Sequence, residues 1–135
     1  MRIKVLLVMR RRILSDALIV KVSNDPEFTI IAEQNYAIAM LTAEVHSPDI
    51  SLIEIPESGP WKSAVKCLAV CDAIRKQIPA CKQVILCNEN DVDSCRAVIR
   101  AKQEHRIDDF LFYDNSMNYL LSKIVALVET ENNIT

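Results

Sequence analysis

Three consecutive arginines, Arg10, Arg11 and Arg12, form the first group of residues whose type and spacing could do chemistry. A guanidinium stays protonated at any ordinary pH and matches the geometry of phosphate and carboxylate groups. The run could therefore bind a nucleotide or another phosphorylated molecule. The alternative is that Arg11 and Arg12 are solvated loop residues, because charged side chains are mostly exposed.

Five cysteines and two histidines are the candidates for metal binding. The cysteine count is odd, Cys67 and Cys71 form no CxxC pair, and His46 and His105 lie far away without ligand spacing. We therefore predict buried, reduced thiols and no metal site, as in a reducing compartment. The sequence also pairs no nucleophile with a general base, so we expect neither an enzyme nor a cofactor.

The elements that position these residues follow from two alternating periodicities. Apolar runs predict five strands, at residues 3–8, 28–32, 50–55, 83–87 and 109–112. Apolar residues at helical spacing predict five helices, at residues 14–22, 38–45, 61–78, 92–99 and 117–128. The second helix has one apolar stripe, made of Ile38, Leu41, Thr42 and Val45. We expect Asn90 and Ser116 to cap the fourth and fifth helices.

Strands that alternate with helices of this length imply right-handed crossovers and a parallel sheet covered on both faces. The predicted fold class is therefore α/β: a three-layer, doubly wound, five-stranded parallel sheet with the flavodoxin-like order 2-1-3-4-5. Ligands bind such a sheet beyond the carboxyl ends of its strands, where the strand order reverses. Residues 9–12 and 54–59 are thus expected to face each other across this crevice.

Composition limits the classes of protein to which the chain can belong. The 135 residues suit one domain, and half of them are hydrophobic, as in ordinary globular proteins. No apolar run approaches membrane length and residues 1–15 lack a cleavage site, so we expect a cytoplasmic protein without a membrane partner. A net charge of −2 argues against direct nucleic-acid binding by this domain.

Four stretches of the sequence carry a family resemblance: IKVLLV, DPEFTIIAE, SPDISLIEI and DDFLFYDNSMNYLLSKI. In these stretches, and in the order and length of its elements, the chain resembles bacterial response-regulator receiver domains of the chemotaxis-receiver type. The resemblance implies one receiver-like domain over residues 1–130 and a flexible tail over residues 131–135. It leaves open whether an output domain follows Thr135, because DPEFTIIAE resembles receivers that precede DNA-binding domains.

The phosphorylation motifs of a receiver are altered here. The resemblance places the acidic pair that holds magnesium at Met9 and Arg10, and the phosphoacceptor aspartate at Glu54. It therefore implies a degenerate pseudo-receiver that holds no metal and cannot be phosphorylated. We hypothesise that Arg10 pairs with Glu54, so that a fixed ion pair replaces metal and phosphate and locks one conformation. The alternative is that nearby backbone amides satisfy Glu54.

The switch residues of a receiver are altered as well. The resemblance places the switch hydroxyl at Cys87, the reporting aromatic residue at Phe110 and the lysine that ends the fifth strand at Tyr113. We expect Phe110 to be plain core. Tyr113 is expected to pack its ring and expose its hydroxyl, although it could instead swing between two positions. Trp61 is expected to anchor the third helix.

A receiver that cannot be phosphorylated would act through its contacts. The resemblance implies a non-enzymatic regulatory or protein-interaction module in two-component signalling, a phosphorelay or transcription regulation. Many receivers dimerise or reach partners through the fourth helix, fifth strand and fifth helix, and here that face would present Arg96, Arg100, Asp109 and Tyr119. The alternative is a sensor of a small anion, a nucleotide or phosphorylated metabolite, that binds at the arginine run.

Overall fold

The computed structural model describes residues 2–132, and the side chains of residues 2–129. The strands are β1 (Ile3–Val8), β2 (Phe28–Glu33), β3 (Ile50–Glu54), β4 (Lys82–Cys87) and β5 (Asp109–Phe112). The helices are α1 (Arg12–Val22), α2 (Ala39–His46), α3 (Ala64–Gln77), α4 (Val92–Gln103) and α5 (Met117–Asn132). A short 3-10 turn, η1 (Tyr36–Ile38), precedes α2. All the predicted strands and helices are present.

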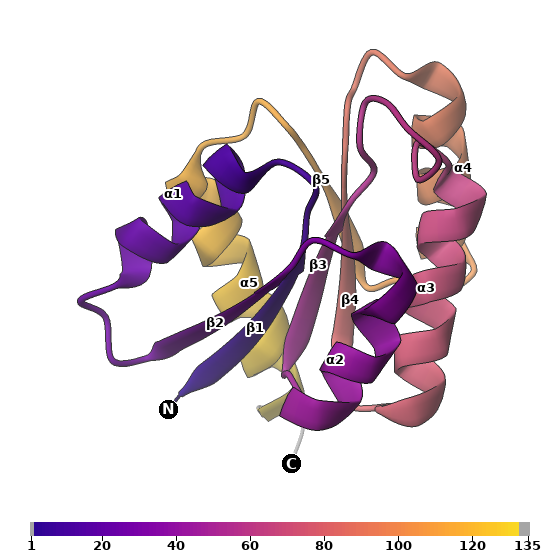
Figure 1. The fold of residues 1–135 in the computed structure, drawn as a ribbon. Helices are drawn as coiled ribbons and strands as arrows, with labels where there is room; N and C mark the ends of the chain where they lie inside the picture. The colour runs from indigo at the N-terminus through magenta and orange to yellow at the C-terminus, as the bar shows by residue number, and fades with distance from the viewer. Residues whose placement is uncertain (1, 133–135) are drawn as a thin grey trace.

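The strands form one parallel sheet in the order β2-β1-β3-β4-β5, which confirms the predicted fold class. Helices α1 and α5 cover one face of the sheet, and α2, α3 and α4 cover the other (Figure 1). The neighbouring strands β1 and β3 pair Val8 with Ile53. This register brings the segments after both strands to the same edge of the sheet, where the crevice was predicted.

Alternating side chains of β1 enter two hydrophobic clusters, one on each face of the sheet. Leu6 and Val8 pack with residues of α2, α3 and α4, whereas Val5 and Leu7 pack with residues of α1 and α5. Side chains of a strand point alternately to opposite faces, so a strand covered on both faces needs apolar residues throughout. For this reason β1 is apolar apart from Lys4, the second residue of the strand, which is half-buried.

The apolar stripe that was predicted to be the buried face of α2 is largely exposed, so this prediction is wrong. Ile38, Leu41 and Val45 are exposed, and Val45 retains 78% of its surface. Ala39 and Ala43, one turn apart, are fully buried instead. Small side chains let a helix backbone approach its neighbours closely, so the alanine face packs best although it is less hydrophobic. Val65, Val92 and Ile99, from the stripes predicted for α3 and α4, are also exposed.

The helix ends confirm one predicted cap and correct another. The Ser116 hydroxyl accepts a hydrogen bond from the Tyr119 N–H at 3.1 Å, as expected for an N-cap. In α4 the cap is Asp91, not Asn90, and its carboxylate accepts from the Ser94 N–H. Helix α5 includes residues 131 and 132 of the predicted tail, and residues 133–135 lie outside the described part of the chain.

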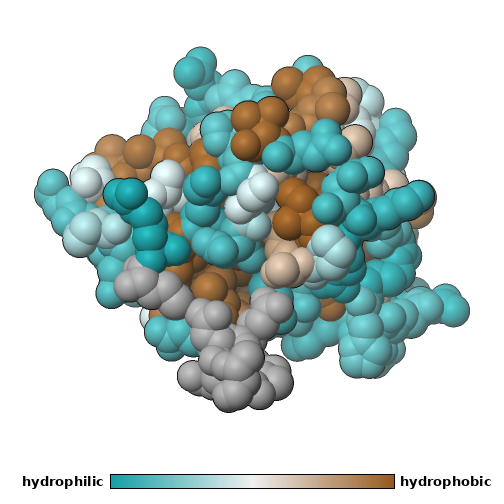
Figure 2. Space-filling model, turned by 90° about the horizontal axis from the view of Figure 1, so that it is seen from below, coloured by the Kyte–Doolittle hydropathy of each residue, from teal (hydrophilic) through white to brown (hydrophobic). Residues whose placement is uncertain are grey.

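The surface bears scattered apolar side chains. Among residues 2–132, no helix combines the length and the hydropathy needed to cross a bilayer. Seen from below, brown hydrophobic patches are separated by teal hydrophilic ones (Figure 2). Isolated exposed apolar residues are common on folded proteins, so this side of the molecule does not by itself indicate a partner.

Candidate functional site

The carboxylate of Glu54, at the end of β3, is fully buried and held by the segment that follows β1. Its Oε1 atom accepts hydrogen bonds from the backbone N–H groups of Arg10 at 3.2 Å and Arg11 at 3.4 Å. Its Oε2 atom accepts from Nε of Arg11 at 2.6 Å, which closes an ion pair. The predicted crevice therefore holds a carboxylate with both oxygen atoms occupied.

The prediction that the Arg10 side chain pairs with Glu54 is wrong, because Arg11 forms the pair. The direction of successive side chains explains the difference. Met9 is buried in the cluster beneath α1 and α5, and consecutive side chains of an extended segment point to opposite sides. Arg10 therefore turns away from that cluster, and Arg11, with extended backbone at φ −81° and ψ 104°, reaches Glu54. The sequence predicted either an arginine or backbone amides as the partner of Glu54, and the structure shows both kinds of donor on this carboxylate.

Arg10 ties down the loop that follows β3. Its Nη1 atom donates to the Ser58 carbonyl at 2.6 Å and to the Ser58 hydroxyl at 3.3 Å. Gly59, the single glycine of the chain, has a positive φ of 86° beneath this guanidinium. A Cβ atom there would lie 2.3 Å from Nη1 of Arg10. The positive φ therefore favours glycine, and a larger residue would also displace the Arg10 guanidinium.

Tyr113 covers the outer side of the Arg11–Glu54 pair. The Arg11 guanidinium lies 4.4 Å from the centroid of the Tyr113 ring, a cation–π contact. The Tyr113 hydroxyl donates a hydrogen bond to the Ile55 carbonyl, a partner that the sequence did not predict. Burial raises the pKa of Tyr113, and the charge of Glu54 raises it further. Tyr113 thus stays a neutral donor that pins its strand end to β3.

Arg11 keeps its charge in this setting. Burial alone would lower the pKa of Arg11, but the hydrogen bond and charge of Glu54 outweigh it, and the pKa is raised. The side chain is still 46% exposed, whereas that of Glu54 is not exposed at all. The pair therefore places a fixed positive charge at the crevice, half in water and half against a buried carboxylate.

Tyr36 holds the backbone of Glu54 from the face of the sheet that α2, α3 and α4 cover. This residue was not identified from the sequence. Its hydroxyl donates to the Glu54 carbonyl at 2.5 Å, and its ring is buried. Burial and the charge of Glu54 raise the pKa of Tyr36, and the same two causes raise that of Cys67 to about 12. The signal available was position: Tyr36 follows β2, whose carboxyl end meets those of β1 and β3 at this edge.

The other predicted site residues lie apart from the Glu54 carboxylate. Arg12 is exposed and begins α1. Cys87 is buried at the end of β4, where burial and the neighbouring Cys95 raise its thiol pKa to about 12. Phe110 is half-buried, and its ring packs edge to face on the ring of Phe112, with the two centroids 5.7 Å apart. Among the described residues no three His, Cys, Asp or Glu side chains are grouped to hold a metal ion.

The five thiols are free in the described structure, as the odd cysteine count predicts. Four of them, Cys67, Cys71, Cys81 and Cys87, are buried, and Cys95 is half-buried. Burial raises the pKa of Cys81 to about 12 as well. A thiol is a nucleophile only as its thiolate, so these buried groups are structural.

The predicted interaction face of α4, β5 and α5 loses one of its members. Asp109 is buried, and its carboxylate accepts hydrogen bonds from Lys102 at 3.0 Å and Lys123 at 3.1 Å. Arg96, Arg100 and Tyr119 are exposed, as expected, and Arg100 pairs with Glu104 one turn away. Asp109 thus joins β5 to both flanking helices instead of facing a partner.

Acid should weaken this junction. Burial alone would raise the pKa of Asp109, but hydrogen bonds from Lys102, the Phe110 N–H and Lys123 outweigh it, and the pKa is lowered. A carboxylate with a lowered folded-state pKa stabilises the fold above its unfolded pKa of about 3.9. That stability should be lost as the pH falls below about 4 and through the folded-state pKa.

Urea unfolding at a series of pH values, for the natural chain and Asp109→Asn, measures this contribution. The variant should be less stable at neutral pH and should lose less stability between neutral pH and pH about 3. Equal losses for both proteins would contradict the assignment.

Comparisons with known proteins give matches among solved structures. No protein-family model and no curated protein sequence matches the chain. A response regulator from Thermotoga maritima is 19% identical with a TM-score of 0.75, and the alignment covers 96% of this chain and 99% of that one. A CheY-like receiver domain from Methanospirillum hungatei is 12% identical with a TM-score of 0.76, and both chains are fully covered.

A DNA-binding response regulator of the LuxR family from Staphylococcus aureus is similar too. It is 18% identical with a TM-score of 0.71, over 93% of this chain and 98% of that one. At such identities the comparisons establish the fold and not the activity. The chain has the fold of response-regulator receiver domains. In this chain an arginine–glutamate pair, Arg11 with Glu54, occupies the crevice.

Proposed function

We propose that this chain is a receiver-like regulatory module that does not accept a phosphoryl group and acts by binding partner proteins. The observation that carries the proposal is the buried Glu54 carboxylate, whose second oxygen contacts Arg11 at 2.6 Å. The receiver fold of its structural neighbours supports a signalling role, in a two-component pathway, a phosphorelay or transcription regulation.

The geometry of the crevice opposes phosphoryl transfer. That reaction needs an accessible nucleophile and a cation that neutralises charge on the transferred group, usually magnesium held by carboxylates. Glu54 has no exposed surface, and both of its oxygens already accept hydrogen bonds. Where the acidic pair would stand, Met9 is buried in the core and Arg10 brings a positive charge.

The same geometry favours one fixed conformation. A guanidinium does not lose its proton at ordinary pH, so the positive charge of the Arg11–Glu54 pair is permanent. Tyr113 and Tyr36 each add a hydrogen bond to a carbonyl at the end of β3. A receiver held in this way presents a constant surface, and its regulation comes from the presence or absence of partners.

The partner surface in this proposal is the face of α4, β5 and α5. Arg96, Arg100 and Tyr119 are exposed there. Mixed polar and aromatic surfaces of this kind set partner choice and register. We propose a protein partner or a second copy of the chain in the cytoplasm as the ligand of this face, without direct contact to nucleic acid.

Incubation with acetyl phosphate and magnesium tests the proposal. Intact-mass measurement should find no phosphoryl adduct on this chain, because Glu54 is buried and, among the residues that the structure describes, no three metal-binding side chains are grouped to hold magnesium. A receiver domain with an intact acidic pair, treated in the same tube, shows that the reagent is active. Phosphoryl label located at Glu54 by peptide mapping would refute the proposal.

A further inference from the structure

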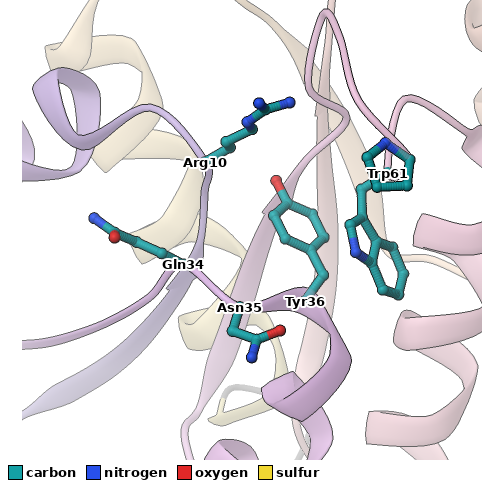
Figure 3. A pocket seen from close by; sticks show the side chains of 6 residues that line it. Arg10, Gln34, Asn35, Tyr36 and Trp61 are labelled. Atoms are coloured by element: carbon teal, nitrogen blue, oxygen red, sulfur yellow. The ribbon is translucent and has the colours of Figure 1, made fainter.

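A cleft lies beside the Arg11–Glu54 pair, and most of the residues that line it have no part in the proposed function (Figure 3). Its volume is about 380 Å³, and it is lined by Arg10, Gln34, Asn35, Tyr36, Pro60 and Trp61. These residues lie after β1, β2 and β3, at the edge where open α/β sheets bind ligands. Sites for small molecules usually enclose about 300 to 1,000 Å³, so the cleft is large enough for one.

One wall of the cleft is a fixed aromatic pair. The rings of Tyr36 and Trp61 stack with centroids 5.3 Å apart and an interplanar angle of 28°. Tyr36 is buried and anchored through its hydroxyl to Glu54, so it holds the half-buried indole from behind. The Asn35 side chain accepts from the Ala37 N–H and fixes the turn that presents Tyr36. An aromatic surface placed in advance lowers the entropic cost of binding a flat ring.

The other functional group of the cleft is a guanidinium whose charge no carboxylate neutralises. Among the residues whose side chains the structure describes, none forms an ion pair with Arg10, in contrast to Arg11. Its hydrogen bonds go from Nη1 to Ser58, which positions the group and leaves the donors on Nη2 and Nε. Arg10 lies on the far side of Tyr36 from Trp61 (Figure 3).

We propose that this cleft binds a small planar anion, an aromatic or heteroaromatic ring that carries a phosphate or carboxylate group. The ring would lie against the aromatic wall that Tyr36 and Trp61 form together, and the anionic group would take the free donors of Arg10. A charge-assisted hydrogen bond to a guanidinium supplies affinity and orientation, and stacking on an aromatic face supplies the rest.

Such a ligand would also reach the buried pair. The Arg10 N–H that donates to Glu54 belongs to the residue that would hold the anion. The hydroxyl of Tyr36, in the wall of the cleft, holds the Glu54 carbonyl. Occupancy of the cleft would therefore stiffen or shift the end of β3. The cleft can bind a ligand whether or not Glu54 accepts a phosphoryl group, so the two proposals stand or fall separately.

Four compounds test the proposal on the natural chain: adenosine monophosphate, benzoate, adenosine and inorganic phosphate. Trp61 is the only tryptophan, so its fluorescence reports the cleft directly, and thermal unfolding gives an independent measure. Adenosine monophosphate, benzoate or both should bind saturably. Adenosine, which lacks the anion, and phosphate, which lacks the ring, should each bind at least about tenfold more weakly than the better of the two.

A matched pair of variants locates the site. Arg10→Gln should weaken binding of the better probe by about tenfold, because it removes the charged donor. Arg12→Gln removes the same charge from an exposed position two residues away and should leave binding unchanged. Saturable binding by the phosphate or the carboxylate probe identifies which anion the site prefers. Absence of binding by both, equal affinity for adenosine, or equal effects of the two variants would overturn the proposal.

Discussion

Replacing Arg11 by methionine should lower the free energy of unfolding by about 3 kcal/mol, because it leaves the buried Glu54 carboxylate without its counter-charge. The two backbone N–H groups that remain on Oε1 cannot replace the charged donor on Oε2. The expected loss lies near the lower end for a broken buried ion pair, because Arg11 itself is half exposed. Urea unfolding at neutral pH measures it.

Glu54→Gln should cost less, about 1 to 2 kcal/mol, because the amide oxygen still accepts the backbone hydrogen bonds and the exposed guanidinium can be hydrated. The double variant, Arg11→Met with Glu54→Gln, should be about as stable as Glu54→Gln alone, since no buried charge remains to be neutralised. Arg12→Met, at the next residue and exposed, is the matched control and should stay within about 0.5 kcal/mol of the natural chain. Additive losses in the double variant would show that Arg11 and Glu54 are not coupled.

Removal of the Tyr36 side chain should have the largest effect on stability at the site. Tyr36→Ala should lower the free energy of unfolding by about 4 kcal/mol, because the residue is 4% exposed and its ring stacks on Trp61. The substitution deletes a buried aromatic ring and the hydrogen bond to the Glu54 carbonyl. The same urea experiment measures this loss, and the fluorescence of Trp61 should change because its stacking partner is gone.

Tyr36→Phe separates the two contributions. It keeps the ring and removes only the hydroxyl, so it should cost about 1 to 2 kcal/mol for a buried carbonyl left without its donor. Tyr119→Ala deletes the same side-chain type from an exposed position on α5 and should cost less than about 1 kcal/mol. If Tyr36→Ala is no more damaging than Tyr119→Ala, the support assigned to Tyr36 is wrong.

In the function proposed above, the chain is a constant module and not a phosphorylation switch. A switch needs two conformations whose populations a modification can shift. The size of that shift is limited by how differently the modifying group interacts with the two conformations. Here the charge that a phosphoryl group and a metal would bring is supplied from within the chain by Arg11 and Glu54. An input to such a module must come from a partner or from a ligand in the cleft at Arg10 and Trp61.

Much of the fold could be predicted from local patterns. The errors arose where contacts between separate elements decided which side chains are buried. All five strands were found, because each is a short, largely apolar run; β1, β3 and β4 are buried almost throughout, and the edge strands β2 and β5 are half-buried or alternate between buried and half-buried residues. The α2 stripe was misplaced because the helix carries two candidate faces, and the fit of Ala39 and Ala43 against neighbouring elements decided between them. Asp109 was predicted to lie on the surface, because the sequence around this aspartate does not indicate that two lysines on the flanking helices form ion pairs with it.

The sequence by itself determined the layers and, given the flavodoxin-like strand order, the edge of the sheet at which Glu54 meets the arginine run. These features depend on hydrophobic periodicity and on the handedness of crossovers, which are local or general. Only the tertiary structure decided that Arg11 and not Arg10 pairs with Glu54, 43 residues away, and that Tyr36 and Tyr113 hold the same strand end. The direction in which adjacent side chains leave a loop depends on backbone angles and on which oxygen atoms are still free, and neither is encoded in residue type or spacing.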